Sequence, residues 1–128
     1  MMVFAKIEPG IVLGQSEFRV TNAEVSEWTS LFPSDGAALP VMPHAMVAMV
    51  SMRAFMEIMQ DRPKGNIHAG QSTLIWALPY IGDILITRLR CIEKTLKDER
   101  RWITFETDTV RSCGKALFRG QMKMLWAA

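Results

Sequence analysis

Few residues of this sequence can carry acid–base chemistry, because its 128 residues include only two histidines. Asp35 lies in a Ser-Asp-Gly stretch, and His44 follows at the start of a long apolar segment. Asp and His side chains transfer protons in many enzymes. We therefore take Asp35 and His44 as the candidate catalytic pair, with turn formation as the alternative role of Asp35.

His68 and Asp83 are the remaining candidates, and each has a structural interpretation. His68 stands where a strand is expected to begin, and a neutral histidine bonded to backbone is the alternative to catalysis. Asp83 follows a glycine, which is typical of a turn. No pair among Asp35, His44, His68 and Asp83 has the spacing of metal ligands, so we expect no metal site.

A long helix is expected over residues 43–60, and it organises the rest of the chain. Its methionines fall three or four residues apart, which is helical spacing; they are Met42, Met46, Met49, Met52, Met56 and Met59. At about 25 Å the segment is too short for a bilayer span, and Arg53 and Glu57 interrupt it. We therefore expect a helix enclosed by the rest of the chain, with unsatisfied backbone N–H groups at its start that favour an oxyanion or carbonyl oxygen.

The segments before this helix predict a strand and a short helix. Residues 11–20 place Phe18 and Val20 on one face of a strand. Thr21 and Glu24 then form a capping box that starts a helix. This helix is expected to pack on the core through Val25, Trp28 and Phe32. Residues 33–42 are rich in turn formers and predict a loop.

Four strands are expected after the long helix. Residues 70–78 are apolar on both faces, which predicts a central strand. Residues 84–95, 101–110 and 115–126 predict three more. In the last, Phe118 and Met122 alternate with Arg119 and Lys123, so one face packs on the helix and the other meets solvent. One long helix wrapped by a curved antiparallel sheet is the hot-dog fold, of class α+β, and we expect one such domain over residues 1–128.

Composition excludes some partners and leaves others open. The hydrophobic fraction of 49% with 22% charged residues is that of a globular protein, with a slight apolar excess that indicates a subunit interface. A net charge of +2 is too small to predict nucleic-acid binding. Ten of the fifteen Lys and Arg residues lie after position 84; they are either solvated strand faces or a place for an anionic cofactor such as the phosphates of coenzyme A.

The two cysteines and the first residues favour a cytoplasmic protein. Cys91 and Cys113 have no metal spacing and predict free thiols in a reducing compartment. The apolar run in MMVFAKIEPG is too short for a signal peptide, and no membrane association is expected.

Three segments resemble a known family: PHAM at 43–46, KGNIHAGQS at 64–72 and LPYIGD at 78–83. In order and spacing they are similar to the MaoC-like hot-dog proteins, the (R)-specific enoyl-CoA hydratases and hydroxyacyl-thioester dehydratases. The resemblance covers residues 14–126. It implies that an Asp and a His in an Asp-x-Asn-Pro-x-His motif activate the water that adds across an enoyl thioester, or remove it in reverse.

The sequence departs from that motif. Asp35 stands at the Asp position, but the next residues are Gly36, Ala37, Ala38, Leu39 and Pro40, so the Asn, Pro and His are missing. The resemblance makes His44 either a substitute base or the family's structural histidine. It also implies that a backbone N–H at the start of the long helix, here that of Ala45, holds the thioester oxygen.

Substrate binding is expected at Ala45, Met46, His68 and Gln71. Gln71 either hydrogen-bonds a thioester or pantetheine amide or bonds its neighbouring strand. The methionines of the long helix are core residues or, alternatively, the adaptable lining of an acyl tunnel.

Three functions remain open on the sequence. The leading hypothesis is an acyl-thioester protein, with a coenzyme A or acyl carrier thioester as substrate and no other cofactor. The second is a non-catalytic acyl-binding or stabilising subunit beside a catalytic hot-dog partner, and the third is a thioesterase. In each case we expect a homodimer or higher oligomer, because hot-dog sheets join edge to edge and exposed edges are a liability.

Overall fold

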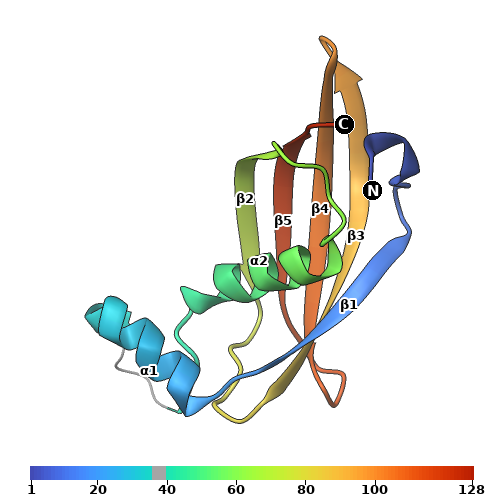
Figure 1. Cartoon of the computed structure of the whole chain (residues 1–128). Helices are drawn as coiled ribbons and strands as arrows, with labels where there is room; N and C mark the ends of the chain where they lie inside the picture. Colours follow the sequence, from blue (N-terminus) through green and yellow to red (C-terminus); the bar gives the residue numbers. More distant parts are fainter. Residues whose placement is uncertain (36–39) are drawn as a thin grey trace.

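The structure is a computed structural model that describes residues 1–35 and 40–128. In chain order its elements are the 3-10 turn η1 (Phe4–Lys6), β1 (Val12–Arg19), α1 (Asn22–Leu31), the 3-10 turn η2 (Pro33–Asp35), α2 (Met46–Ile58), β2 (Ile67–Ile75), β3 (Ile84–Lys97), β4 (Arg100–Arg111) and β5 (Ala116–Trp126) (Figure 1). The strand, the short helix, the long helix and the four further strands expected from the sequence are all present, while residues 36–39 of the predicted loop lie outside the described residues.

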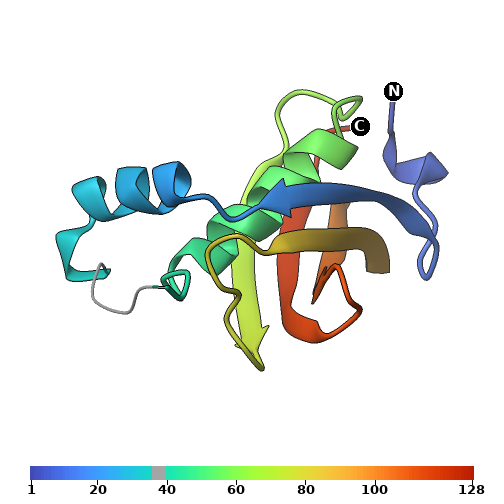
Figure 2. The ribbon, with the colours of Figure 1, turned by 90° about the horizontal axis from the view of Figure 1, so that it is seen from below.

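The five strands form one antiparallel sheet in the order β1-β3-β4-β5-β2. Helix α2 lies across one face of this sheet, while α1 projects away from it (Figures 1 and 2). A long helix against a curved antiparallel sheet is the hot-dog arrangement, so the predicted fold class is confirmed.

The core lies between α2 and the sheet. Phe55 of α2 packs against Phe105 and Trp126, with ring centroids 5.2 and 6.4 Å away. Nearer the start of α2, Met46 and Val47 pack in a second buried cluster that contains Phe18, Val20, Leu85, Leu117 and Phe118. The alternation predicted for β5 is thereby confirmed at Phe118 and Met122, which are both buried.

Helix α2 is shorter and less enclosed than the sequence suggests. It begins at Met46 and ends at Ile58, so Pro43 lies before the helix and not in its first turn. Its buried residues face the sheet, but a solvent-facing stripe remains; the exposed positions are Ala48, Arg53, Met56 and Glu57. The methionine spacing indicated the helix but not its orientation, because methionine suits both core and half-exposed sites.

The prediction that the strand after the long helix is central is wrong. Strand β2 is the edge of the sheet, paired only with β5, and all nine of its residues are exposed. The apolar residues on both faces of this strand predict that both faces are buried, but they do not show which part of the protein buries them. Among the described residues, neither α2 nor a further strand covers β2.

Helix α1 contacts the core through Val25 and Trp28, as predicted, but not through Phe32. Val25 is its one buried residue, whereas Phe32 is half exposed, so the predicted packing of Phe32 on the core is wrong. The Thr21 hydroxyl accepts the Glu24 backbone N–H at 3.1 Å. The other half of the capping box is absent from the hydrogen bonds of the described residues, because the Glu24 carboxylate binds Arg53 instead.

Two further sequence observations are clear in the structure. Cys91 is buried, Cys113 is exposed, and both are free thiols. Among the described residues, no helix is long and apolar enough to cross a membrane.

Candidate functional site

The start of α2 is held by a short stretch of paired backbone. Val41 forms an isolated bridge with Tyr80, and the Met42 N–H donates to the Pro79 carbonyl at 2.9 Å. The Ile81 N–H donates to the Pro40 carbonyl at 2.7 Å. The turn at residues 78–83 therefore fixes the direction in which α2 begins.

The backbone N–H of Ala45, just before α2, is available for a ligand. The Met46 and Val47 N–H groups bond the carbonyls of Pro43 and His44 at 3.0 and 3.1 Å. Ala45 is the N-cap residue and provides no side-chain cap. Its own N–H has no hydrogen-bond acceptor among residues 1–35 and 40–128. Because the helix dipole places partial positive charge at this end, the Ala45 N–H suits an oxygen that carries negative charge.

A groove of about 160 Å³ lies beside this helix start, between α1 and α2. Its lining is mainly apolar on the inner side and charged at the rim; the residues are Glu24, Glu27, Trp28, Leu31, Met46, Met49 and Arg53. Met46 follows Ala45 directly, so the groove begins next to the free N–H. We call this the α1–α2 groove.

Asp35 is linked to the α1–α2 groove through Trp28. The Trp28 indole N–H donates to Asp35 Oδ2 at 2.9 Å, which holds both side chains in place. The indole also packs on Phe32, with ring centroids 4.7 Å apart. Asp35 is partly buried and lies in η2, directly after the end of α1.

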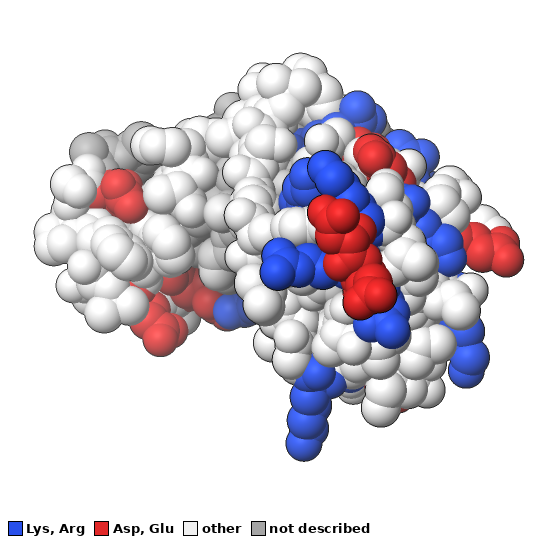
Figure 3. Space-filling model, turned by 90° about the horizontal axis from the view of Figure 1, so that it is seen from above, with Lys and Arg blue, Asp and Glu red and all other residues white. Residues whose placement is uncertain are grey.

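Arg53, the positively charged residue in the lining of the α1–α2 groove, is already paired with a carboxylate. Arg53 Nη1 lies 3.2 Å from Glu24 Oε1, and its guanidinium also covers the Phe18 ring at 4.9 Å. No other Lys or Arg occurs between residues 20 and 60. In Figure 3 the part of the molecule that carries the sheet shows many Lys and Arg side chains, whereas the α1 side shows mainly Asp and Glu. Phosphate-binding cations must therefore come from elsewhere.

The structure brings together only some of the predicted site residues. Asp35, Ala45 and Met46 belong to the α1–α2 groove or its immediate border. His44 is exposed at the start of α2 and makes no hydrogen bond or ion pair with Asp35 among the described residues. Of the positions where the resemblance motif is broken, residues 36–39 lie outside the described residues, whereas Pro40, at the position of the missing His, is described and exposed.

His68 and Gln71 lie on the edge strand and not in the α1–α2 groove. His68 Nε2 is 3.1 Å from the Gly70 carbonyl oxygen of its own strand, which matches its structural interpretation. Gln71 pairs in register with Met122, whose side chain is buried under α2. Register thus places Gln71 on the helix side of an exposed edge, where a second molecule can reach it.

Sequence reasoning missed the walls of the α1–α2 groove. The predicted contact of Trp28 with the core is confirmed, but its second role as a wall of the groove was not predicted, and neither was that of Leu31, one of the most exposed apolar residues. One signal was present: Trp28 and Leu31 continue an apolar face of α1 beyond the buried Val25. The sequence does not show that α1 leaves the sheet after one turn.

A helix laid on a curved antiparallel sheet, with a groove at its free N-terminal end, defines the hot-dog class of protein. No family model matches this chain, and no curated protein matches it. Solved structures do match in fold. A MaoC-like dehydratase from Rhodospirillum rubrum has a TM-score of 0.82 at 17% identity, covering 98% of this chain and 97% of the other.

Two further structures give the same result. The (R)-hydratase from A. caviae, described as involved in PHA biosynthesis, has a TM-score of 0.75 at 17% identity over 94% of this chain and 98% of its own. The HadBC (3R)-hydroxyacyl-ACP dehydratase complex from Mycobacterium tuberculosis matches with a TM-score of 0.70 at 11% identity, over 86% and 90%. Proteins described as thioesterases match as well. These likenesses show that the chain has the hot-dog fold.

Proposed function

We propose that this protein binds acyl thioesters as a hot-dog protein of the hydratase and dehydratase class. The observation that carries the proposal is the α1–α2 groove, which joins an unpaired helix N-terminal N–H to an apolar channel and a fixed carboxylate. A thioester needs these features: a donor for its carbonyl oxygen and an apolar wall for its acyl chain. The matched structures described as hydratases and dehydratases support the same class.

The substrate would bind with its carbonyl oxygen at the Ala45 N–H. The acyl chain would then pass along Met46 and Met49 on one side and Trp28 and Leu31 on the other. Methionine side chains adapt to ligands of different shape. The rim pair of Glu24 and Arg53 would disfavour a long apolar chain at the far end, because burying an ion pair against hydrocarbon costs free energy.

In its catalytic form the protein would use Asp35 as the general base for water. Asp35 would take a proton from water, the hydroxide oxygen would form the bond to C3 of the enoyl thioester, and C2 would take up a proton. The second proton-transfer group would be His44, or His68 of a second copy. The negative charge that develops on the thioester oxygen would be stabilised at Ala45.

One observation favours a second candidate, a non-catalytic acyl-binding subunit. One oxygen of Asp35 is already bound by the Trp28 indole, and no histidine bonds this carboxylate among the described residues. A carboxylate without a partner histidine has lost half of the usual acid–base pair. The protein would then hold or stabilise an acyl group for a catalytic hot-dog partner.

The second copy of the chain is proposed to pair along β2. This edge carries exposed apolar side chains at Ile67, Leu74 and Ile75 and no lysine or arginine, so apart from the bulge after His68 nothing among the described residues protects it from pairing. The other edge, β1, is protected by a bulge near Gly14 and by Pro9 just before the strand. Pairing of two β2 strands would continue the sheet and bring His68 and Gln71 next to the partner.

The test is to mix the purified protein with trans-2-enoyl-CoA and saturated acyl-CoA thioesters and follow enoyl absorbance and thiol release together. Asp35→Asn and His44→Ala are the test variants, and Asp61→Asn is the surface control. Enoyl loss that Asp35→Asn removes and Asp61→Asn keeps would support the hydratase. Binding without turnover would support the partner subunit, and thiol release alone would assign the protein to the thioesterases. Absence of binding to every thioester would overturn the proposal.

A further inference from the structure

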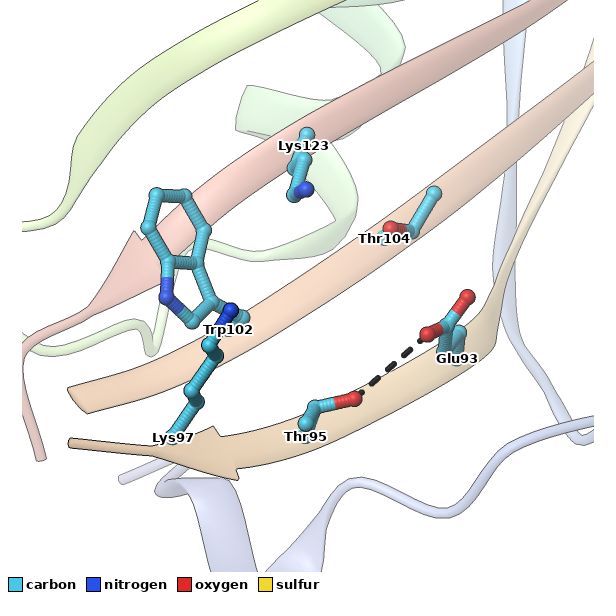
Figure 4. Close-up of a pocket in the computed structure, with 6 residues that line it drawn as sticks. All are labelled: Glu93, Thr95, Lys97, Trp102, Thr104 and Lys123. Atoms are coloured by element: carbon cyan, nitrogen blue, oxygen red, sulfur yellow. Dashed lines mark hydrogen bonds between the residues drawn. The ribbon is translucent and has the colours of Figure 1, made fainter. Parts of the chain in front are cut away.

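A second groove crosses the face of the sheet that points away from α2 (Figure 4). It consists of two adjoining hollows of about 320 and 390 Å³, which share Glu93, Thr104 and Lys123. One hollow also contains Trp102 and Lys97, and the other continues across β5 to the edge strand β2. We call the two hollows together the outer groove.

Strand register explains why the outer groove exists. Glu93, Thr104 and Lys123 lie opposite one another on β3, β4 and β5, and Gly70 of β2 lies opposite Lys123. Side chains in such a row share one face of the sheet. Thr104 and Gly70 are short, so they form a floor between longer neighbours. Bulges after Cys91 in β3 and after His68 in β2 flank this row.

The outer groove combines an aromatic face with two available cations. Lys123 Nζ lies 5.1 Å from the centroid of the Trp102 ring, and Figure 4 shows Lys97 on the other side of this indole. Neither lysine forms an ion pair within the described part of the chain. In contrast, Arg90 and Arg119 on the same face are both bound to carboxylates. The two lysines are therefore free to bind an anion.

Polar groups lie beside the aromatic face. The Thr95 hydroxyl donates to Glu93 Oε1 at 3.4 Å, which leaves the other carboxylate oxygen open as an acceptor. The Thr104 hydroxyl lies between Glu93 and Lys123 in the same row. A ligand here would meet an aromatic platform, hydrogen-bonding groups and two positive charges within one hollow.

We propose that the outer groove binds a nucleoside phosphate, with its base against Trp102 and its phosphate between Lys97 and Lys123. Bases stack on aromatic side chains, and lysine binds phosphate as a point charge. An inorganic anion would make no use of the indole, and an apolar ligand would make no use of the lysines. The Glu93 carboxylate can accept a hydrogen bond from a base amino group. This site goes beyond the proposed function, because it lies on the opposite face of the sheet from the α1–α2 groove.

Two sources share this chemistry: a free nucleotide, and the adenosine phosphate portion of coenzyme A. The first probe is therefore ADP, measured by isothermal titration calorimetry against the full chain at low salt. Adenosine, ribose 5-phosphate, inorganic phosphate and coenzyme A are the parallel arms. We expect ADP to bind more tightly than any fragment of it, since both the base and the phosphate contribute. If coenzyme A binds and ADP does not, the site is supported with coenzyme A as the source of the ligand, provided that the same variants weaken the binding of coenzyme A.

The variants separate stacking and charge from general effects. Trp102→Leu and Lys123→Gln should each weaken binding on the order of tenfold, and Trp102→Phe should restore most of it because a ring remains. The control is Lys115→Gln, an exposed lysine in the turn between β4 and β5. Equal binding of phosphate and ADP, no effect of Trp102→Leu, or no binding of ADP and coenzyme A would each overturn the proposal. The proposal would also be overturned if Lys123→Gln changed the oligomeric state while the wild type bound no nucleotide. The outer groove would then be part of a protein interface.

Discussion

Glu106 is a nearly buried carboxylate on the outer face of the sheet, and its neighbours explain how a charge can lie there. It accepts hydrogen bonds from Arg90 Nη2 at 2.8 Å and from Gln121 Nε2 at 3.0 Å, and Arg119 lies 3.6 Å away. Burial raises the pKa of Glu106, but the hydrogen bonds from Arg90 and Gln121 and the charge of Arg119 outweigh it, so the pKa is lowered overall.

This lowered pKa predicts acid sensitivity of folding. Because the folded pKa lies below the unfolded value, Glu106 contributes stability at neutral pH that is lost as pH falls through the folded pKa. We expect Glu106→Gln to lower the free energy of unfolding at neutral pH by about 1–3 kcal/mol. The variant should also lose less stability than the wild type on acidification. Urea unfolding at successively lower pH measures both effects.

The control for this prediction is Glu17→Gln, which removes an exposed carboxylate of β1. It should change stability little at any pH. An unchanged acid dependence in Glu106→Gln would show that other groups cause the acid transition.

Among the elements, α2 and the sheet approach each other closely at Gly120 of β5. A Cβ atom there would lie 2.8 Å from Thr107 Oγ1 and 3.1 Å from Ser51 Oγ. Ser51 is buried in α2, and its hydroxyl has no partner in the described structure. A glycine is therefore required at this position by close packing between helix and sheet, and not by backbone conformation.

Gly120→Ala should destabilise the protein by overpacking the interface between α2 and β5. We expect a loss of about 1–3 kcal/mol, because neither Thr107 nor the α2 backbone can move freely. The matched control is Gly70→Ala, where an added Cβ would meet only Lys123 Cβ at 4.0 Å. Thermal unfolding followed by circular dichroism compares the two variants. Equal melting temperatures for both would contradict the packing argument.

At the scale of the whole molecule, the edge strand β2 keeps its apolar side chains exposed in a single chain. Leu74 is 55% exposed and Trp76, just after the strand, is 52% exposed. Edge strands that stay monomeric usually carry lysine, proline or cover. Strand β2 has none of these, which is why a second copy is proposed to complete it.

Leu74→Lys should therefore convert an oligomer to a monomer. Pairing would remove water from the added lysine and would bring it near the same lysine of the second copy, to which a two-fold axis relates it. The control is Leu96→Lys, because Leu96 is 67% exposed near the tip of the β3–β4 hairpin, away from β2. Light scattering after size-exclusion chromatography gives the mass of each variant. A wild-type monomer would remove the basis for pairing along β2.

The sequence by itself determined the order of elements and the face that β5 buries. Alternation of apolar and polar residues in β5 and the methionine spacing of α2 both report local geometry, because side-chain periods of two and 3.6 residues follow from the backbone. The same local chemistry identified the cap at Thr21 and the free thiols of Cys91 and Cys113.

Tertiary structure decided what the sequence left open. It placed β2 at an edge, formed the α1–α2 groove beside Trp28, and brought Glu93, Thr104 and Lys123 into one row. These results depend on the order of strands in the sheet and on the direction of α1, which arise from long-range packing. An apolar pattern predicts that a surface is buried, but only the assembled fold shows whether the same chain, a ligand or a second copy buries it.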